Sequence, residues 1–477
     1  MKEPKKIKIG LFGIGLKKYW DQFDGLLERL QGYQTLINKK ISEDEQITIV
    51  DGGMVDTIDT AMETADMFRH ADVSLIFLYV STYALSATVL PVVQKNKVPV
   101  IILNLQPGEA IDYAWFNNLK DRGKMTGEWL ANCQACSVPE IANVFTRANI
   151  DFHQVTGTHI DVEAWKEITD WIAAAKVACI MQNNRLGVLG HYYNGMLDIY
   201  TDLTLQSIVF GTYIQHIEIC ELSEIRKTIQ EAEIKAKRNQ LSQEFHVLQE
   251  CSEQALDDAA KTSAALDYLV AKYNLGSLAY YYEGRDGSEY EDLISSVIAG
   301  NSILTAHHVP VAGEYEIKNA QAMKIMDAFG AGGSFSEFYA LDFKEDVILL
   351  GHDGPGHLAI AEGMPILKPL GIYHGKPGKG LSVEMKVKHG PVTLLSVVET
   401  KNGGLKLVIA EGESVPGPIL EIGNTNSRYK FATGVKKFID QWSQQGPAHH
   451  CAIGTGHLSD KITKLGKILK IEVVNVC

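Results

Sequence analysis

Residues 6–15, KIKIGLFGIG, form a short apolar run near the start of the chain, and two similar runs follow, VSLIFLYV at 73–80 and VPVIILNL at 98–105. Between these runs lie segments with apolar residues at helical spacing, at 21–40 and 61–70. This alternation predicts strand–helix units over about the first 175 residues. Such units form a doubly wound parallel sheet with helices on both faces and right-handed crossovers.

A second set of α/β units is predicted from RLGVLGHYY at 185–193. A long helical region at 221–274 follows, and then a buried strand, LGSLAYYYEG at 275–284. The next segments, YEDLISSVIAG at 290–300 and NAQAMKIMDAF at 319–329, are predicted as helices, the first of them ended by its glycine.

The pattern changes after about residue 330, where alternating strands replace the α/β units. Three strands are predicted at 380–390, 391–400 and 405–413, with a hairpin at Asn402–Gly403–Gly404. This favours a small antiparallel barrel, closed by a helix and a strand at 460–476. The predicted architecture is therefore an N-terminal α/β domain (1–178), a central α/β domain (179–330) and a C-terminal antiparallel β-barrel-like domain (331–477).

Composition excludes several classes of function. The chain has 477 residues, 45% of them hydrophobic, and a net charge of −13. An acidic chain without a concentrated basic face argues against nucleic acid as a partner. No apolar stretch reaches the ~18 residues of a membrane span, and the short apolar start alternates with lysine, so we expect a cytoplasmic protein.

Seven cysteines are scattered along the chain, an odd number that does not indicate a disulfide framework. We expect reduced thiols. The one close pair, Cys133 and Cys136, is a single CxxC and is interpreted as incidental.

The glycines at the end of the first strand do not form a nucleotide-binding fingerprint. Gly10, Gly13 and Gly15 give G-x-x-G-x-G rather than G-x-G-x-x-G, and no acidic partner follows at a second strand end. We interpret them as a tight strand-to-helix connection.

Two carboxylates and two histidine positions in the last third of the chain are the candidate ligands of a metal site. Glu314 lies in VAGEYEIKNA, Glu337 in GGSFSEFYALDF, His352 in LLGHDGPGH, and His449 and His450 in GPAHHCAIGTGH. Each lies beside glycine or at the edge of an apolar run. Carboxylate and imidazole together suit Mn²⁺, Co²⁺ or Fe²⁺ better than a thiolate-bound structural zinc.

Each of these residues also has a simpler interpretation. Glu314 could be a carboxylate favoured by a helix N-terminus. Glu337 lies between two phenylalanines, where an unpaired buried charge would be costly and a metal would supply the partner. His352 ends an apolar strand and opens a glycine-rich loop, a common place for ligand groups.

The remaining histidines are less specific. His357 could support the site from behind or be structural. His449 and His450 are adjacent, and in extended chain their side chains point in opposite directions, so only one is expected to bind a metal while the other contacts substrate.

Taken together, these segments resemble the L-arabinose isomerase family, within the wider group that includes L-fucose isomerase. The resemblance covers AGE and its following helix, GGSFSEFYALDF, LLGH and G-x-AHH, in the order of the family. It implies a homotrimer or homohexamer with active sites between subunits. It also implies the following metal ligands: Glu314, Glu337, His352 and His450.

The resemblance extends to substrate contacts. It implies that His449, Gln134, Met196 and Tyr282 bind the sugar. Two departures fall where sugar hydroxyls are recognised: Ser137 replaces a family histidine, and GIGLKKYW at 13–20 replaces a loop that offers a glutamine. These departures affect the identity of the sugar more than the reaction.

The implied function is aldose–ketose isomerisation of a linear sugar, L-arabinose to L-ribulose or a related pair. A divalent metal, Mn²⁺ before Co²⁺ or Fe²⁺, would polarise the carbonyl, and Glu314 and Glu337 would form the acid/base pair through a cis-enediol. Two alternatives stay open: another sugar isomerase or epimerase of the same superfamily, and a non-catalytic or regulatory sugar-binding protein on the same fold.

Overall fold

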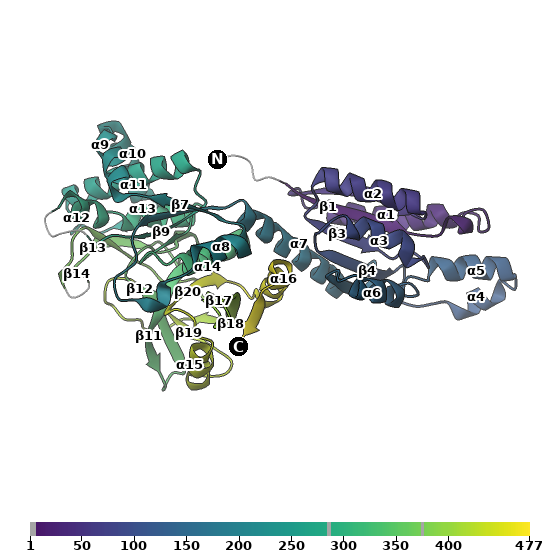
Figure 1. Ribbon diagram of the computed structural model, residues 1–477. Coiled ribbons are helices and arrows are strands. Elements are labelled where there is room, and N and C mark those ends of the chain that lie inside the picture. The colour runs from purple at the N-terminus through teal and green to yellow at the C-terminus, as the bar shows by residue number, and fades with distance from the viewer. Residues whose placement is uncertain (1–5, 284–287, 374–375) are drawn as a thin grey trace. The chain divides into compact units, whose positions relative to one another are not determined.

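The computed structural model describes residues 6–283, 288–373 and 376–477, and divides into two compact units, Met1–Cys179 and Ile180–Cys477 (Figure 1). The boundary falls within the long helix α7 (Val162–Gln182). Within the described residues no helix has the length and apolar character that a membrane span requires.

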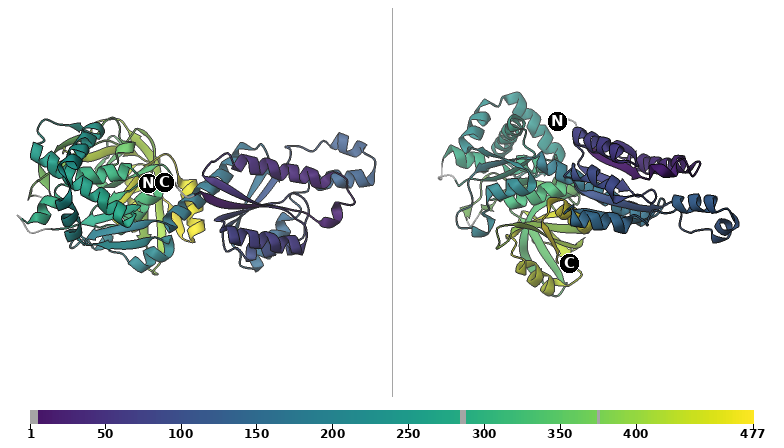
Figure 2. Two further views of the ribbon diagram at one scale, coloured as in Figure 1. Left: turned by 90° about the horizontal axis from the view of Figure 1, so that it is seen from above. Right: turned by 45° about the vertical axis from the view of Figure 1, so that its right-hand side comes forward.

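The first unit is a doubly wound α/β domain, as its alternating sequence predicts. Its five strands are all parallel, in the order β2-β1-β3-β4-β5. Helices cover both faces of the sheet (Figure 2). The strands are β1 (Ile7–Ile14), β2 (Ile47–Val55), β3 (Leu75–Tyr79), β4 (Val100–Gln106) and β5 (Phe152–Thr158); the helices before α7 are α1 (Leu26–Ile41), α2 (Ile58–Ala71), α3 (Ser86–Gln94), α4 (Tyr113–Asn118), α5 (Arg122–Ala131) and α6 (Val138–Arg147).

A disulfide joins Cys133 to Cys136 in the turn between α5 and α6, so the expectation of reduced thiols is wrong for this pair. The turn places the two Cα atoms 5.6 Å apart, within the range that a disulfide bridges. Cys133 is buried and Cys136 is exposed, and the described chain holds five free cysteines besides them.

The second unit begins with a four-stranded parallel sheet in the order β10-β9-β6-β7. The predicted strand at 275–284 is β9, and it is buried along its whole length. The strands are β6 (Arg185–Gly190), β7 (Tyr213–Ile217), β9 (Ser277–Tyr281) and β10 (Val311–Ala312); the helices are α8 (Leu203–Phe210), α9 (Ile219–Thr228), α10 (Glu231–Glu244), α11 (Glu253–Tyr273), α12 (Glu289–Ile294), α13 (Ile298–Ala306) and α14 (Ile317–Ala328).

The C-terminal strands form a closed barrel. The sheet order is β17-β20-β11-β12-β19-β18-β21, and pairing of β17 with β18 closes six antiparallel strands into a ring. β21 adds parallel to β18, and α14 packs against β11, β17 and β20 (Figure 1). The elements are β11 (Gly332–Asp342), β12 (Val347–His352), β17 (Gly390–Glu399), β18 (Leu405–Val415), β19 (Thr425–Lys430), β20 (His450–Thr455), β21 (Glu472–Asn475), α15 (Val435–Gln444) and α16 (Ser459–Leu469).

The barrel confirms the predicted antiparallel C-terminal structure. The glycine-rich turn Asn402–Gly404 connects β17 to β18, with Gly403 at a φ of 76° and Thr400 N–H bonded to the Gly404 carbonyl. The predicted strand at 380–390 is shorter than expected and lies outside the barrel. It forms β16 (Leu381–Glu384), beside β13 (Ile366–Pro369) and β8 (His246–Val247); a small two-stranded ribbon pairs β14 (Ile372–Tyr373) with β15 (Lys376–Pro377).

Two helical predictions are wrong in detail. The segment 290–300 is not one helix ended by glycine, because α12 ends at Ile294 and Gly300 lies inside α13. A Cβ at Gly300 would approach the Cα of Ser263 to 2.9 Å, so this glycine permits close packing of α13 on α11. The region 221–274 is three helices interrupted by β8.

The predicted division of the second unit into two domains at 330/331 stays a prediction, since the second unit is compact as a whole.

The disulfide predicts the outcome of thiol labelling. Alkylation of the denatured protein without reductant should label five cysteines, and labelling after reduction should reach all seven. A double variant with Cys133→Ser and Cys136→Ser should label five in both cases. Mass spectrometry of intact protein reads the number, and seven labels without reductant would contradict the bond.

Candidate metal centre

Glu314 lies at the carboxyl end of the parallel sheet, the edge where open α/β sheets bind ligands. It follows the short strand β10 and the intervening Gly313. A side chain at Gly313 would meet the Phe335 ring at 3.2 Å and the His352 ring at 3.7 Å, so glycine is needed for the backbone to approach the barrel. The carboxylate is thereby placed against strands β11 and β12.

The turn that carries Glu314 is strained. Glu314 and Tyr315 both have left-handed φ angles, 57° and 61°. A non-glycine residue in this region costs on the order of 1–3 kcal/mol and persists only where its surroundings enforce it. Backbone hydrogen bonds do so here: Tyr315 N–H donates to the Tyr280 carbonyl and Glu316 N–H to the Gly313 carbonyl. Strained residues of this kind are concentrated at functional sites.

Three histidines from the barrel surround the Glu314 carboxylate. His352 ends β12, His450 begins β20, and His449 lies in the bend before it. From Glu314 Oε2, Nε2 of His450 lies at 3.4 Å and Nε2 of His449 at 3.5 Å. Nε2 of His352 lies 3.8 Å from Oε1. The ligand atoms of Glu314, His449 and His450 all lie within 4.8 Å of one another.

These atoms converge without satisfying one another. Oε2 of Glu314 and Nε2 of His450 are buried and have no hydrogen-bond partner among the described residues. Buried polar groups are normally paired. Two ligands about 2.1 Å from one ion lie roughly 3.0–3.4 Å apart, close to the separations found here. The geometry and the donor set therefore fit a divalent cation, whose identity they do not define.

Two carboxylates that the sequence did not reveal are hydrogen-bonded to the Nδ1 atoms of His449 and His450, the ring nitrogens that face away from Glu314. Nδ1 of His450 is hydrogen-bonded to Oε2 of Glu316, which is 1% exposed. Nδ1 of His449 lies 2.6 Å from Oδ2 of Asp198. Carboxylates on Nδ1 fix the ring so that Nε2 faces the metal. The only sequence signal is the E-x-E spacing of Glu314 and Glu316; nothing in the sequence marks Asp198.

The charges in the centre shift several pKa values. Burial raises the pKa of Glu314, but His352, His449 and His450 outweigh it and hold the carboxylate ionised, well below its usual range. Burial likewise lowers the pKa of His449, but Glu314 and Asp198 raise it to about 9. Burial lowers the pKa of His352, helped by neighbouring His450 and opposed by Glu314. A neutral His352 is the form that binds metal.

Glu337 reaches the same region through strand register. It pairs with His450 on the neighbouring strand β20 and with Gly351, next to His352, on the other neighbouring strand, β12. Directly opposed residues have Cβ atoms ~5 Å apart on one face, so Glu337 is adjacent to His450. Its side chain is half-buried, and Phe338 faces away, packed on Phe438 and Trp442. Glu337 is therefore not a fully buried charge between two phenylalanines, as the sequence suggested. The strand register, not that argument, places it next to His450.

The expected opposition of His449 and His450 is also wrong. Their ring centroids lie 3.8 Å apart, and both Nε2 atoms face the same Glu314 oxygen. Strand alternation does not apply because β20 begins only at His450. Both histidines can therefore reach a common ion; the role of His449 in contacting substrate stays a prediction.

The other predicted sugar contacts lie in different surroundings. Met196 is half-buried, two residues before Asp198. Tyr282 follows β9 and packs against His191 and Tyr290.

The remaining predicted contact, Gln134, belongs to the first unit. It is fully buried, and its Nε2 donates to the carbonyls of Ser81 and Ala131. Ser137, in place of the family histidine, is also buried and bonds the backbone of Ala84. Both side chains are buried in this conformation, although Oε1 of Gln134 has no hydrogen-bond partner among the described residues. The role of Gln134 stays a prediction.

Comparison with known proteins identifies the barrel. Residues 332–472 match the sequence model of the L-arabinose isomerase C-terminal domain. This domain points to a sugar isomerase. The chain thus carries the C-terminal domain of the L-arabinose isomerase family, which supports the family resemblance predicted from the sequence. No curated protein matches the chain.

The raised pKa of His449 predicts a pH dependence for the metal-free protein. Its folded pKa, about 9, exceeds its ordinary value of 6.5, so between these values the folded chain binds more protons than the unfolded chain. The stabilisation is complete below 6.5 and is lost as the pH rises through about 9. Denaturant unfolding across this window measures it. Asp198→Asn should flatten the slope and exposed Asp440→Asn should not; equal slopes in all three proteins would contradict the assigned cause.

Replacing Glu316 should weaken metal binding without removing a metal ligand. In Glu316→Gln an acceptor for His450 Nδ1 remains but its charge is lost, and the affinity for Mn²⁺ should fall roughly 10- to 100-fold. Competition with a chelating dye measures the affinity. The control is Glu413→Gln, an exposed position on β18. Wild-type affinity in Glu316→Gln would show that this carboxylate does not support the centre.

Proposed function

We propose that the chain is a metal-dependent aldose–ketose isomerase that acts on a linear sugar, L-arabinose or a related aldose. The observation that carries the proposal is the convergence of the Glu314, His449 and His450 ligand atoms within 4.8 Å. The matched isomerase domain supports the reaction class, because this domain contributes both histidines. Mn²⁺, with Co²⁺ or Fe²⁺ as alternatives, suits a centre of carboxylate and imidazole ligands.

In this proposal the ligands are Glu314, Glu337, His352 and His450, as the family resemblance implies. A divalent ion bound there supplies Lewis acidity to the sugar's C1 carbonyl and C2 hydroxyl. The protein holds this position with imidazole rings fixed by Glu316 and Asp198. The ring of Phe335 lies 4.3 Å from that of His450 and 4.4 Å from that of His352, and it excludes water from that side.

Proton transfer is assigned to the two glutamates jointly. Isomerisation moves a proton from C2 to C1 and another between the two oxygens, through a cis-enediol. Glu314 is ionised in the metal-free centre, where the three histidines hold its pKa low. It is therefore in the form that binds a metal and can accept a proton, although a low pKa makes it a weak base. Glu337 lies half-buried beside His450, and in this proposal it contacts the substrate from strand β11. His449, with its raised pKa, would donate a hydrogen bond to a sugar oxygen.

Assembly belongs to the same proposal. Family resemblance implies a homotrimer or homohexamer, with the substrate contacts of the first unit, Gln134 among them, completing the centre of a neighbouring subunit. The cytoplasmic location expected from the sequence belongs to the proposal as well. The sugar's identity depends on those contacts, and the burial of Ser137 and Gln134 in this conformation motivates an assay with a panel of aldoses rather than L-arabinose alone.

Replacing Glu337 tests the reaction. With saturating Mn²⁺, Glu337→Gln should lower turnover by at least about 100-fold, the scale of a lost acid/base group, while the fold is retained. Ketose formation and exchange of the C2 proton with solvent deuterium measure the reaction across the aldose panel. Exposed Glu472→Gln on β21 is the control.

The same assay separates the alternatives. Exchange without ketose formation would indicate an epimerase, and sugar binding without exchange in the wild-type protein would indicate a binding protein. Normal turnover in Glu337→Gln would remove this residue from the mechanism.

A further inference from the structure

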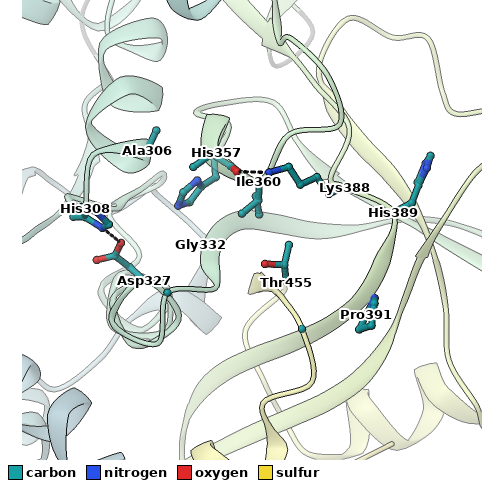
Figure 3. A pocket seen from close by; sticks show the side chains of 13 residues that line it. Ala306, His308, Asp327, Gly332, His357, Ile360, Lys388, His389, Pro391 and Thr455 are labelled. Atoms are coloured by element: carbon teal, nitrogen blue, oxygen red, sulfur yellow. Dashed lines mark hydrogen bonds and ion pairs between the residues drawn. The ribbon is translucent and has the colours of Figure 1, made fainter. Parts of the chain in front are cut away.

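A cavity lies in the C-terminal unit and is lined by none of the metal-centre residues. Its volume is about 430 Å³, within the range of pockets that hold small organic ligands. Figure 3 shows the side chains around it. Its polar lining comes from His308, Asp327, His357, Lys388, His389 and Thr455.

The cavity lies at the far end of the strand pair that builds the metal centre. Register pairs Glu337, in the middle of β11, with His450 at the start of β20, and it pairs Gly332, at the start of β11, with Gly454 near the end of β20. Gly332 and Thr455, next to Gly454, line the cavity. Five residues of strand separate the two places, roughly 17 Å. The cavity is therefore a separate site rather than an extension of the metal centre.

His357 is the unexplained group in this cavity. It is 3% exposed, and neither ring nitrogen has a hydrogen-bond partner on another described residue. Its ring points into the space between Gly332 and the His308–Asp327 pair (Figure 3). Burial lowers its pKa to about 4, so the ring is neutral and carries one donor and one acceptor. Leaving both unsatisfied is costly, and a bound polar ligand would relieve that cost.

The charge that faces the cavity is positive. Asp327 is the one carboxylate in its lining, and both oxygens are taken, Oδ1 by His308 Nδ1 at 2.8 Å and Oδ2 by Lys324 Nζ at 2.8 Å. Lys388 Nζ donates to the Ala359 carbonyl at 3.0 Å, and an ammonium has two further donors. The His389 ring points away (Figure 3). The remaining donors, on Lys388 and His357, favour an oxyanion.

We propose that this cavity binds the phosphate group of a small phosphorylated metabolite, with Lys388 and His357 contacting the phosphate oxygens. A phosphate alone would fill only part of the volume, and the rest, floored by Ile360, Pro391 and the glycines, accommodates a short carbon chain. The two nitrogens of an imidazole point in diverging directions, so one phosphate contacts one of them: a P–O⁻ oxygen accepts from an N–H, or a P–OH group donates to an unprotonated nitrogen. This site is independent of the proposed isomerase reaction.

Calorimetric titration of the metal-loaded, full-length protein tests the site with three probes: glycerol 3-phosphate, inorganic phosphate and glycerol. None of them is an aldose, so binding does not require the isomerase reaction. We expect saturable binding of glycerol 3-phosphate at one site per chain, weaker binding of inorganic phosphate and none of glycerol.

Variants assign the site. Lys388→Met should weaken glycerol 3-phosphate binding about tenfold or more, the effect of losing a charged hydrogen bond. Lys386→Met, exposed two residues away and outside the cavity, is the matched control and should bind as wild type. His357→Phe should also lose binding, and if that variant does not fold, the lysine pair decides.

Three outcomes would overturn the proposal. They are the absence of binding, glycerol binding as well as its phosphate, and equal affinities in Lys388→Met and Lys386→Met. The last would place the phosphate elsewhere, including at the metal.

Discussion

The centre depends on one buried negative charge. Glu314 is 9% exposed, and three imidazoles lie within 4 Å of its oxygens. An unpaired carboxylate at this depth would be protonated or would destabilise the fold. The histidines keep it ionised, and they do so while leaving buried nitrogen and oxygen atoms without hydrogen bonds. That combination, a charge retained but not fully satisfied, distinguishes a ligand site from a structural ion pair.

The fold delivers these groups from two different sheets. Glu314 comes from the end of a two-residue parallel strand, whereas the histidines come from the barrel. The left-handed residues Glu314 and Tyr315 turn the chain between them, a local cost of a few kcal/mol. Glu316, two residues further on, then holds His450 from the start of α14. The segment 314–316 thus provides the ligand Glu314, the turn that orients it, and the carboxylate of Glu316 that holds His450 in place.

The sequence predicted several of the strands, the hairpin and the segments that carry Glu314, His352, His449 and His450, because local periodicity and glycine positions are properties of nearby residues. The supporting carboxylates could not be predicted, because Asp198 and His449 are 251 residues apart and no short-range pattern joins them. The alternation rule failed at His449 because the strand begins one residue later. Gly300 was misread as a helix end because packing of α13 on α11, not local propensity, requires glycine there.

Closure of the barrel has a mechanical consequence. Since β17 pairs with β18, β11, β12 and β20 belong to a continuous ring, and none of them can shift without breaking hydrogen bonds to both neighbours. His352 and His450 are therefore held in fixed positions by the barrel, whereas Glu314 follows a strand of only two residues. An ion bound by all three residues would link the barrel to the parallel sheet. Metal binding would therefore stabilise the packing of these two layers against each other.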